Sequence, residues 1–209
     1  MSSLPRLIVI TDWRLPRARL LEAVGRSLEA GPGVAIQHRH PEAPARAFLE
    51  EARLLAALCH RRGNPLFVNG RLDVALLVGA HLHLPARGLT VEDVRPHLPA
   101  GHWVSAAVHD MDEARLAHGA DLALVSPVYA PGSKPGDTRP PLGLEGFQAL
   151  AAALPCPALA LGGVTPERAG KLAGAHGFAV ISAVLEATDP AAVARALLRA
   201  ATPSGQEMA

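Results

Sequence analysis

The feature that most constrains this fold is the alternation of short, β-rich apolar runs with longer stretches of helical spacing. Eight such runs occur, at Leu7–Asp12, Val34–Arg39, Pro65–Asn69, His81–Leu84, His102–His109, Asp121–Tyr129, Ala158–Gly162 and Phe178–Val184. Strands that alternate with helices predict a parallel sheet, because each helix carries the chain back to the edge where the next strand begins.

The segments between these runs are rich in Ala, Leu, Glu and Arg, with apolar residues three and four positions apart. A first helix is marked by Leu20, Leu21, Val24 and Leu28, and a second by Phe48, Ala52, Leu55 and Leu58. Later helices are predicted near Asp73–Val78, Val91–His97, Asp112–His118, Leu144–Leu154, Pro166–Ala173 and Pro190–Ala201. We expect Thr90, Thr165 and Asp189 to cap three of these helices, and a proline follows the last two at the first helical position.

Two architectures fit eight strands that alternate with helices. A doubly wound open sheet places a G-x-G-x-x-G phosphate loop after its first strand, but the stretch "ITDWRLP" has no such glycines. A (β/α)₈ barrel, the TIM barrel, places its phosphate site after strands seven and eight. A glycine pair follows the seventh run, so we expect an α/β fold consisting of one TIM barrel over residues 1–201, with 202–209 as a short tail.

Composition narrows the function classes. The 209-residue chain is 49% apolar, carries a net charge of +1 and has no basic block, so we expect no nucleic-acid or membrane partner. Its two cysteines show no metal-ligand spacing and predict buried thiols in a reducing compartment. The N-terminal apolar run is too short for a signal peptide, and no stretch is long enough to span a membrane, so we expect a cytoplasmic protein.

The glycine pair Gly162–Gly163 ends the seventh run, where backbone N–H groups without a neighbouring Cβ can approach an anion. After the eighth run, Ser182 and Ala183 are expected to open a short helical turn with its free N–H groups aimed at the same place. The position predicts a phosphate site. Two ordinary βα turns are the alternative reading.

Other polar residues lie at predicted strand ends. Gln37 and Arg39 alternate along the second strand, so both are expected to point into the barrel mouth, and Asn69 ends the third. His109 lies at the open end of the fifth strand.

The long Gly- and Pro-rich loop "SPVYAPGSKPGDTRPPLG" follows the sixth strand and carries Ser133 and Lys134. Long loops in compact domains are often lids, so Lys134 is a candidate to close over an anion. A solvated surface lysine is the alternative.

The segments "IQHR", "VNGRLDVALLVGAHLHL", "SPVYAPGSK", "LALGGV" and "VISAV" occur in an order and spacing that resemble the thiamine phosphate synthase/TenI family, from about Leu7 to Ala201. The resemblance implies a TIM barrel that binds a thiazole phosphate in thiamine biosynthesis. It implies that the phosphate is held by Gly162, Gly163, Ile181 and Ser182, and that the other ligand contacts are Gln37, Arg39, Asn69, Ser133 and Lys134.

The chain also departs from the synthase pattern. The lysine after strand two is replaced by Pro41, and the two magnesium-binding aspartates by Gly70 and Gly88. The strand-five serine is Ala107, although Ser105 lies two residues earlier on the same face. Asp73, one helical turn from Gly70, is a poor substitute. A departing pyrophosphate needs a metal and cations to stabilise its charge, so these losses argue against synthase activity.

Three readings follow from the resemblance. The first is a TenI-like thiazole tautomerase, which needs acid–base groups and an anion site but no metal or other cofactor. The family's catalytic histidine falls on Pro127, so His109 or His40 would have to serve, with Lys134 as a third candidate. His38 and His83 also lie near strand ends.

The second reading is a non-catalytic protein that binds a thiazole phosphate. The third is a divergent thiamine phosphate synthase that uses magnesium. In every case the expected partner is a small phosphorylated thiazole, and a homodimer formed through the outer helices is possible.

Overall fold

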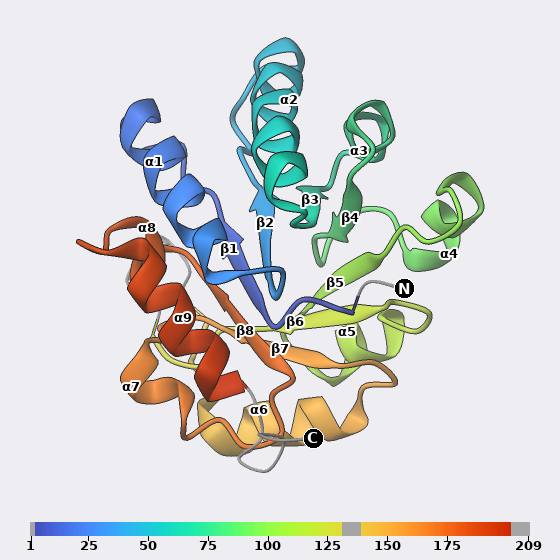
Figure 1. The fold of residues 1–209 in the computed structure, drawn as a ribbon. Coiled ribbons are helices and arrows are strands. Elements are labelled where there is room, and N and C mark those ends of the chain that lie inside the picture. The colour runs from blue at the N-terminus through green and yellow to red at the C-terminus, as the bar shows by residue number, and fades with distance from the viewer. Residues whose placement is uncertain (1–2, 131–138, 202–209) are drawn as a thin grey trace.

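The computed structural model describes residues 3–130 and 139–201. Its eight parallel strands form a closed barrel in chain order (Figure 1). The strands are β1 (Leu7–Ile10), β2 (Val34–His38), β3 (Leu66–Asn69), β4 (His81–Leu84), β5 (Val104–Val108), β6 (Leu122–Val125), β7 (Ala158–Leu161) and β8 (Gly177–Val180). The predicted TIM barrel is confirmed.

Helices form a ring outside the strands in Figure 1. Within the described ranges they are α1 (Arg17–Ser27), α2 (Ala45–Arg62), α3 (Leu72–Val78), α4 (Val91–Val94), α5 (Met111–Leu116), α6 (Gly143–Ala153), α7 (Pro166–Ala169), α8 (Ser182–Leu185) and α9 (Pro190–Ala201), with 3₁₀ turns at Leu28–Ala30 and Arg95–His97. None of these helices is long and apolar enough to cross a membrane.

Several elements are shorter than their apolar patterns. The fifth run begins at His102, but β5 begins at Val104, and β6 stops at Val125 although the apolar run continues to Tyr129. The predicted seventh helix ends early, because α7 stops at Ala169 and a looser turn follows. An apolar run in the sequence indicates buried residues, and these include loop residues that pack on the barrel. The run is therefore longer than the strand.

Strand register sorts side chains between the barrel interior and the helix layer, since paired residues of neighbouring strands face the same side. Ile10 pairs with Gln37, which pairs with Phe67. One layer nearer the carboxyl ends of the strands, Asn69, His83 and Ser105 form the next row. The Nδ1 atom of His83 lies 2.9 Å from the Ser105 hydroxyl, so this interior layer is polar.

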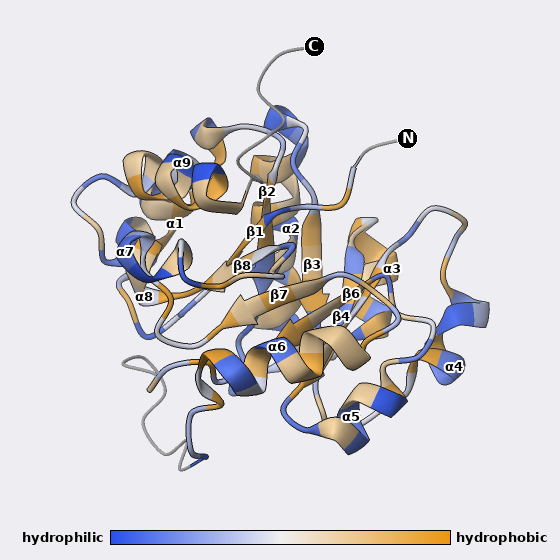
Figure 2. Cartoon of the chain, turned by 90° about the horizontal axis from the view of Figure 1, so that it is seen from below, coloured by the Kyte–Doolittle hydropathy of each residue, from blue (hydrophilic) through white to orange (hydrophobic). Residues whose placement is uncertain are grey.

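The apolar core lies both inside the barrel and between the strands and the helices. Figure 2 shows the strands as mostly hydrophobic, while hydrophilic residues lie on the outer helix surfaces. Its bulkiest buried side chains are Phe67, Phe147 and Phe178, surrounded by Leu, Ile, Val and Ala. Burial of this aliphatic surface stabilises the barrel.

Candidate functional site

The glycine pair after β7 adopts backbone conformations that favour glycine, with φ of +99° at Gly162 and +61° at Gly163. A Cβ on Gly162 would lie 2.9 Å from the Cα of Pro127, and one on Gly163 would lie 2.8 Å from the Cβ of Tyr129. The residues are therefore small because the loop after β6 packs directly against the turn. This packing accounts for the glycines without any ligand.

Backbone hydrogen bonds hold the two loops together. The N–H of Val128 donates to the Leu161 carbonyl at 2.8 Å, and the N–H of Tyr129 donates to the Gly162 carbonyl at 3.0 Å. These contacts use the carbonyl groups of the turn rather than its N–H groups. The N–H groups of the glycine turn consequently remain available.

The end of β8 offers further donors. The expected short turn is present as α8, in which the first N–H groups to donate are those of Val184 and Leu185, both to Ile181. Among the described residues, no backbone carbonyl accepts from the N–H of Gly163, Ser182 or Ala183. Because β7 and β8 are neighbours, these donors occupy adjacent strand ends, an arrangement suited to a small anion.

The end of β2 supplies two polar side chains. Gln37 is 1% exposed, and its Nε2 atom has no hydrogen-bond partner among the described residues. The backbone of Arg39 is fixed by Thr11, whose hydroxyl accepts from the Arg39 N–H and donates to the Arg39 carbonyl. In the described part of the chain the Arg39 guanidinium has no hydrogen-bond or ion-pair partner, so it is free to meet an anion.

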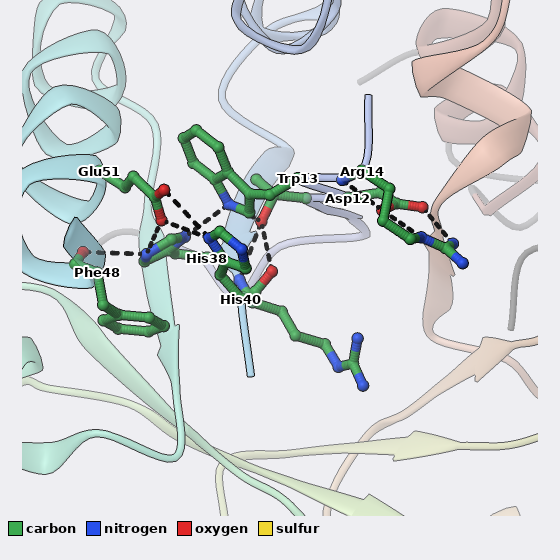
Figure 3. Close-up of polar contacts among 9 residues, drawn as sticks. Asp12, Trp13, Arg14, His38, His40, Phe48 and Glu51 are labelled. Atoms are coloured by element: carbon green, nitrogen blue, oxygen red, sulfur yellow. Dashed lines mark hydrogen bonds and ion pairs between the residues drawn. The ribbon is translucent and has the colours of Figure 1, made fainter. Parts of the chain in front are cut away.

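His38 lies outside the barrel interior, so it is not one of the histidines at the barrel mouth, although it is close to a strand end in the sequence. Figure 3 shows it between Trp13 and Phe48. Trp13 Nε1–H donates to Nδ1 at 3.2 Å, so the proton sits on Nε2, which donates to the Phe48 carbonyl at 3.2 Å. Burial lowers the pKa of His38 to about 4. Both ring nitrogens are occupied, and the ring is neutral at physiological pH.

His40 also faces the helix layer. Its Nδ1 lies 2.9 Å from Oε2 of Glu51 on α2, and its ring stacks on Trp13 at 5.6 Å and 7° (Figure 3). The same carboxylate lies 3.6 Å from Nε2 of His38. Trp13, His38, His40 and Glu51 thus form one network that joins the ends of β1 and β2 to α2.

His109 follows β5 and pairs with Glu113 on α5. Its Nδ1 lies 2.6 Å from Oε2 of Glu113, and its backbone N–H donates to the same oxygen at 2.8 Å. Asp110 caps the helix by accepting from the N–H of Glu113. A carboxylate on Nδ1 holds the imidazole with Nε2 as the free acceptor, the arrangement that a general base requires.

A small cavity beside this pair is lined by Gly88, Ala107 and Glu113, together with apolar residues of the β4–α4 loop and α5. Gly88 and Ala107 stand where the synthase pattern has an aspartate and a serine. The two departures from the synthase pattern therefore line the same cavity. Gly88 has a φ of +137°, a conformation that aspartate rarely adopts.

The substitute carboxylate considered from sequence is directed elsewhere. Asp73 forms an ion pair with Arg71 at 2.6 Å, and its side chain is 60% exposed. The hydrogen bond from Arg71 lowers the pKa of Asp73. In residues 3–130 and 139–201, no group of three His, Cys, Asp or Glu side chains is placed to hold a metal ion.

Ser133 and Lys134, predicted as lid contacts, lie outside the described residues, as does the expected tail at 202–209. Sequence reasoning also missed Glu113, Glu51 and Trp13. A signal existed for Glu113, because "DMDE" places a Glu three residues after a helix-capping Asp and four after His109. Glu51 and Trp13 meet the histidines only through the tertiary fold.

Comparisons with known proteins identify the family. A family model described as thiamine monophosphate synthase matches residues 7–184. Thiamine-phosphate synthase from Moorella thermoacetica is 39% identical over 201 residues, covering 94% of this chain and 95% of the relative. The enzyme of that name from Chloroflexus aurantiacus is 38% identical over 209 residues, with coverages of 98% and 95%.

Solved structures give the same result. Thiamine phosphate pyrophosphorylase from Pyrococcus furiosus superposes with a TM-score of 0.80 at 32% identity, covering 94% of this chain and 95% of that one. A 3-hexulose-6-phosphate synthase, at 19% identity and a TM-score of 0.65 over 94% of this chain and 99% of that one, shares the fold alone. The chain therefore belongs to the thiamine monophosphate synthase/TenI family, as its five sequence motifs predict.

Proposed function

We propose that this protein binds a thiazole phosphate at the carboxyl ends of β7 and β8 and acts on it as a metal-independent thiazole tautomerase. The observation that carries the proposal is the His109–Glu113 pair, which lies beside the cavity where glycine and alanine occupy synthase positions. The His109–Glu113 pair supplies an acid–base group beside Gly88, the position at which the synthase pattern has a metal-binding aspartate.

The phosphate would be held by the N–H groups of Gly163, Ser182 and Ala183. Arg39 adds a guanidinium from the end of β2, and Gln37 adds an unpaired amide within the barrel. Backbone donors and a guanidinium together suit a phosphate ester.

The tautomerisation moves a proton without any change of oxidation state. Nε2 of His109 removes a proton from one carbon of the thiazole carboxylate phosphate, and a proton is returned at the other end of the shifted double bond. Glu113 stabilises the imidazolium that forms between these steps. We assign the base to His109 rather than His40 because residue 109 follows the interior positions 105 and 107 of β5, whereas the His40 ring stacks on Trp13 in the helix layer.

The test is turnover of the thiazole tautomer in D₂O, followed by deuterium incorporation. His109→Gln should lower kcat by about 100-fold or more, as expected for the loss of a general base, with the affinity for the phosphorylated thiazole unchanged. Glu113→Gln should lower kcat less and change its pH profile. Melting curves check that both variants fold. Full activity in His109→Gln, or a comparable loss only in His40→Gln, would overturn the assignment.

The names of the related proteins favour a second candidate, a divergent thiamine phosphate synthase. In that reaction pyrophosphate leaves a pyrimidine and the thiazole nitrogen bonds to the resulting cation. It predicts magnesium-dependent formation of thiamine phosphate from both substrates. No product above a control without enzyme would exclude it.

A binding measurement distinguishes the third reading, a non-catalytic binding protein, from the tautomerase and the synthase. A thermal-shift titration compares hydroxyethylthiazole phosphate with the unphosphorylated thiazole and inorganic phosphate. Ligand at about one hundred times its Kd adds about 2.7 kcal/mol of stability, or about 5–10 °C in Tm for a chain of this size. A shift specific to the phosphorylated thiazole, without turnover in either assay, identifies a non-catalytic binding protein.

A further inference from the structure

Arg168, at the end of α7, contacts both loops that form the glycine turn. Its Nη1 donates to the carbonyl of Gly163 at 2.8 Å, and its guanidinium carbon lies 5.1 Å from the centre of the Tyr129 ring. Tyr129 belongs to the loop after β6, whereas Gly163 follows β7. We call this group of Arg168, Gly163 and Tyr129 the arginine clamp.

The clamp adds a third contact to a tightly packed turn. A Cβ placed on Gly163 would lie 2.8 Å from Tyr129 Cβ, 2.9 Å from the Ala130 carbonyl oxygen and 3.2 Å from Arg168 Nη1. The turn is thus enclosed by the loop after β6 and by Arg168. The loop after β6 holds the Gly162–Gly163 peptide, which carries the Gly163 N–H, through the Gly162 carbonyl, and Arg168 holds the following peptide through the Gly163 carbonyl.

The carboxylate of Glu167, the preceding residue, interacts electrostatically with Arg168. In the described residues no carboxylate forms an ion pair with Arg168, and its hydrogen bond to Gly163 uses one of the five N–H donors of a guanidinium. The backbone donors at β7 and β8 carry no formal charge, while a phosphate monoester carries close to two negative charges at neutral pH. A cation beside this turn would therefore strengthen phosphate binding.

We propose that Arg168 is a second cation of the β7–β8 phosphate site, in addition to Arg39, holding the carbonyl of Gly163 and contributing positive charge to the phosphate group. This inference rests on the proposed function, since it assigns a further residue to the same site. Arg168 is a positioning and binding residue and takes no part in proton transfer.

The sequence supplies a clean reporter, because Tyr129 is the only tyrosine in the chain. A protein labelled with fluorotyrosine gives one ¹⁹F resonance, from a ring that lies beneath the Arg168 guanidinium. Titration with inorganic phosphate and with hydroxyethylthiazole phosphate is followed by this resonance and by calorimetry. The variants are Arg168→Gln and Arg168→Lys. Lys171→Gln is the matched control, which removes an exposed positive charge three residues away.

We expect Arg168→Gln to weaken binding of both phosphate compounds about tenfold, and Arg168→Lys to weaken it less. Lys171→Gln should change the Kd by less than about twofold, because exposed charges are screened by salt. The affinity for the unphosphorylated thiazole should be the same in all variants. Melting curves establish that each variant is folded.

Two results would overturn the inference, and they differ. If the wild type binds a phosphate compound and Arg168→Gln binds it equally well, or loses no more affinity than Lys171→Gln, Arg168 is not a cation of the site and the proposed function stands. If the wild type binds neither phosphate compound, the phosphate site itself is refuted, and the role of Arg168 with it.

Discussion

At the scale of single residues, glycine sets how closely two segments of this barrel approach. Gly162 and Gly177 lie at opposite ends of neighbouring strand segments, and both are close to backbone atoms of another segment. A Cβ on Gly177 would overlap with the backbone carbonyl of Arg6, where β8 meets the chain before β1. These contacts are between backbones, which cannot rotate away.

Replacing these glycines with alanine should therefore have graded effects. Gly177→Ala should be the most destabilising, by about 4 kcal/mol or more, and Gly162→Ala should cost about 2 kcal/mol because it combines a positive φ with a close contact. Gly25→Ala is the control, since Gly25 lies inside α1 with nothing within 4 Å of an added Cβ, and it should stabilise by about 0.5–1 kcal/mol. Urea unfolding measures all three, and equal losses would contradict the contact argument.

The thiols show how far a sequence predicts a residue's environment. The sequence predicts two buried thiols, and both cysteines are free in the structure, but Cys59 is buried whereas Cys156 is only partly buried. Burial raises the pKa of Cys59 to about 12 and that of Cys156 to about 11. At pH 8 we expect neither to react readily with a thiol reagent in the native protein, and Cys59 to react only on unfolding. Rapid native-state labelling of Cys59 would contradict its burial.

Histidines show where such prediction stops. The alternation along β2 predicts that Gln37 and Arg39 share one face, but it gives no information on what each imidazole contacts. The carboxylates of Glu51 and Glu113 approach His40 and His109 from helices. Only the latter pair has a local sequence signature, because Glu113 lies within one helical turn of His109.

At the scale of elements, the order and type of strands and helices followed from hydrophobic period and capping residues. Their ends did not, because a strand ends where its ladder ends and an apolar run can continue into a buried loop. The loop after β6 is the clearest example: Val128 is fully buried outside any strand. The arginine clamp was equally inaccessible to sequence reasoning, since it joins residues that only the barrel closure brings together.

Helix caps give a matched test at this scale. Thr90 forms a complete capping box with Asp93 at the start of α4, whereas Thr165 occupies the same position before α7 without a cap hydrogen bond. Thr165 is at the predicted N-cap position, but its side chain does not form the predicted capping hydrogen bond. Thr90→Ala should cost about 1 kcal/mol and Thr165→Ala much less. Thermal unfolding of the two variants measures the difference, and equal costs would show that the capping box contributes nothing.

At the scale of the whole molecule, buried histidines make stability depend on pH. Burial lowers the pKa of both His38 and His81 from the ordinary value of 6.5 to about 4. Between these values the unfolded chain binds more protons than the native protein. The free energy of unfolding should therefore fall as the pH falls from about 6.5 to about 4, by up to about 3 kcal/mol for each histidine.

Denaturant unfolding at several pH values measures this slope. His38→Gln removes one titrating ring and should flatten the dependence between pH 6.5 and 4, even though it lowers stability at neutral pH by disturbing the contacts with Trp13 and Phe48. An unchanged slope in this variant would show that His38 is not held neutral by the fold.

Closure of the barrel has a consequence for how the protein assembles. Each strand pairs with the strand before it in the chain, except that β1 also pairs with β8, so one edge of β1 waits for a partner more than 160 residues away. Such a distant pairing makes closure entropically expensive and late. The proposed phosphate site lies at the carboxyl ends of β7 and β8, and β8 forms one side of this seam, so the proposed site is complete only once the final strand is in place. An anion that binds there would select the finished barrel over every partly assembled one.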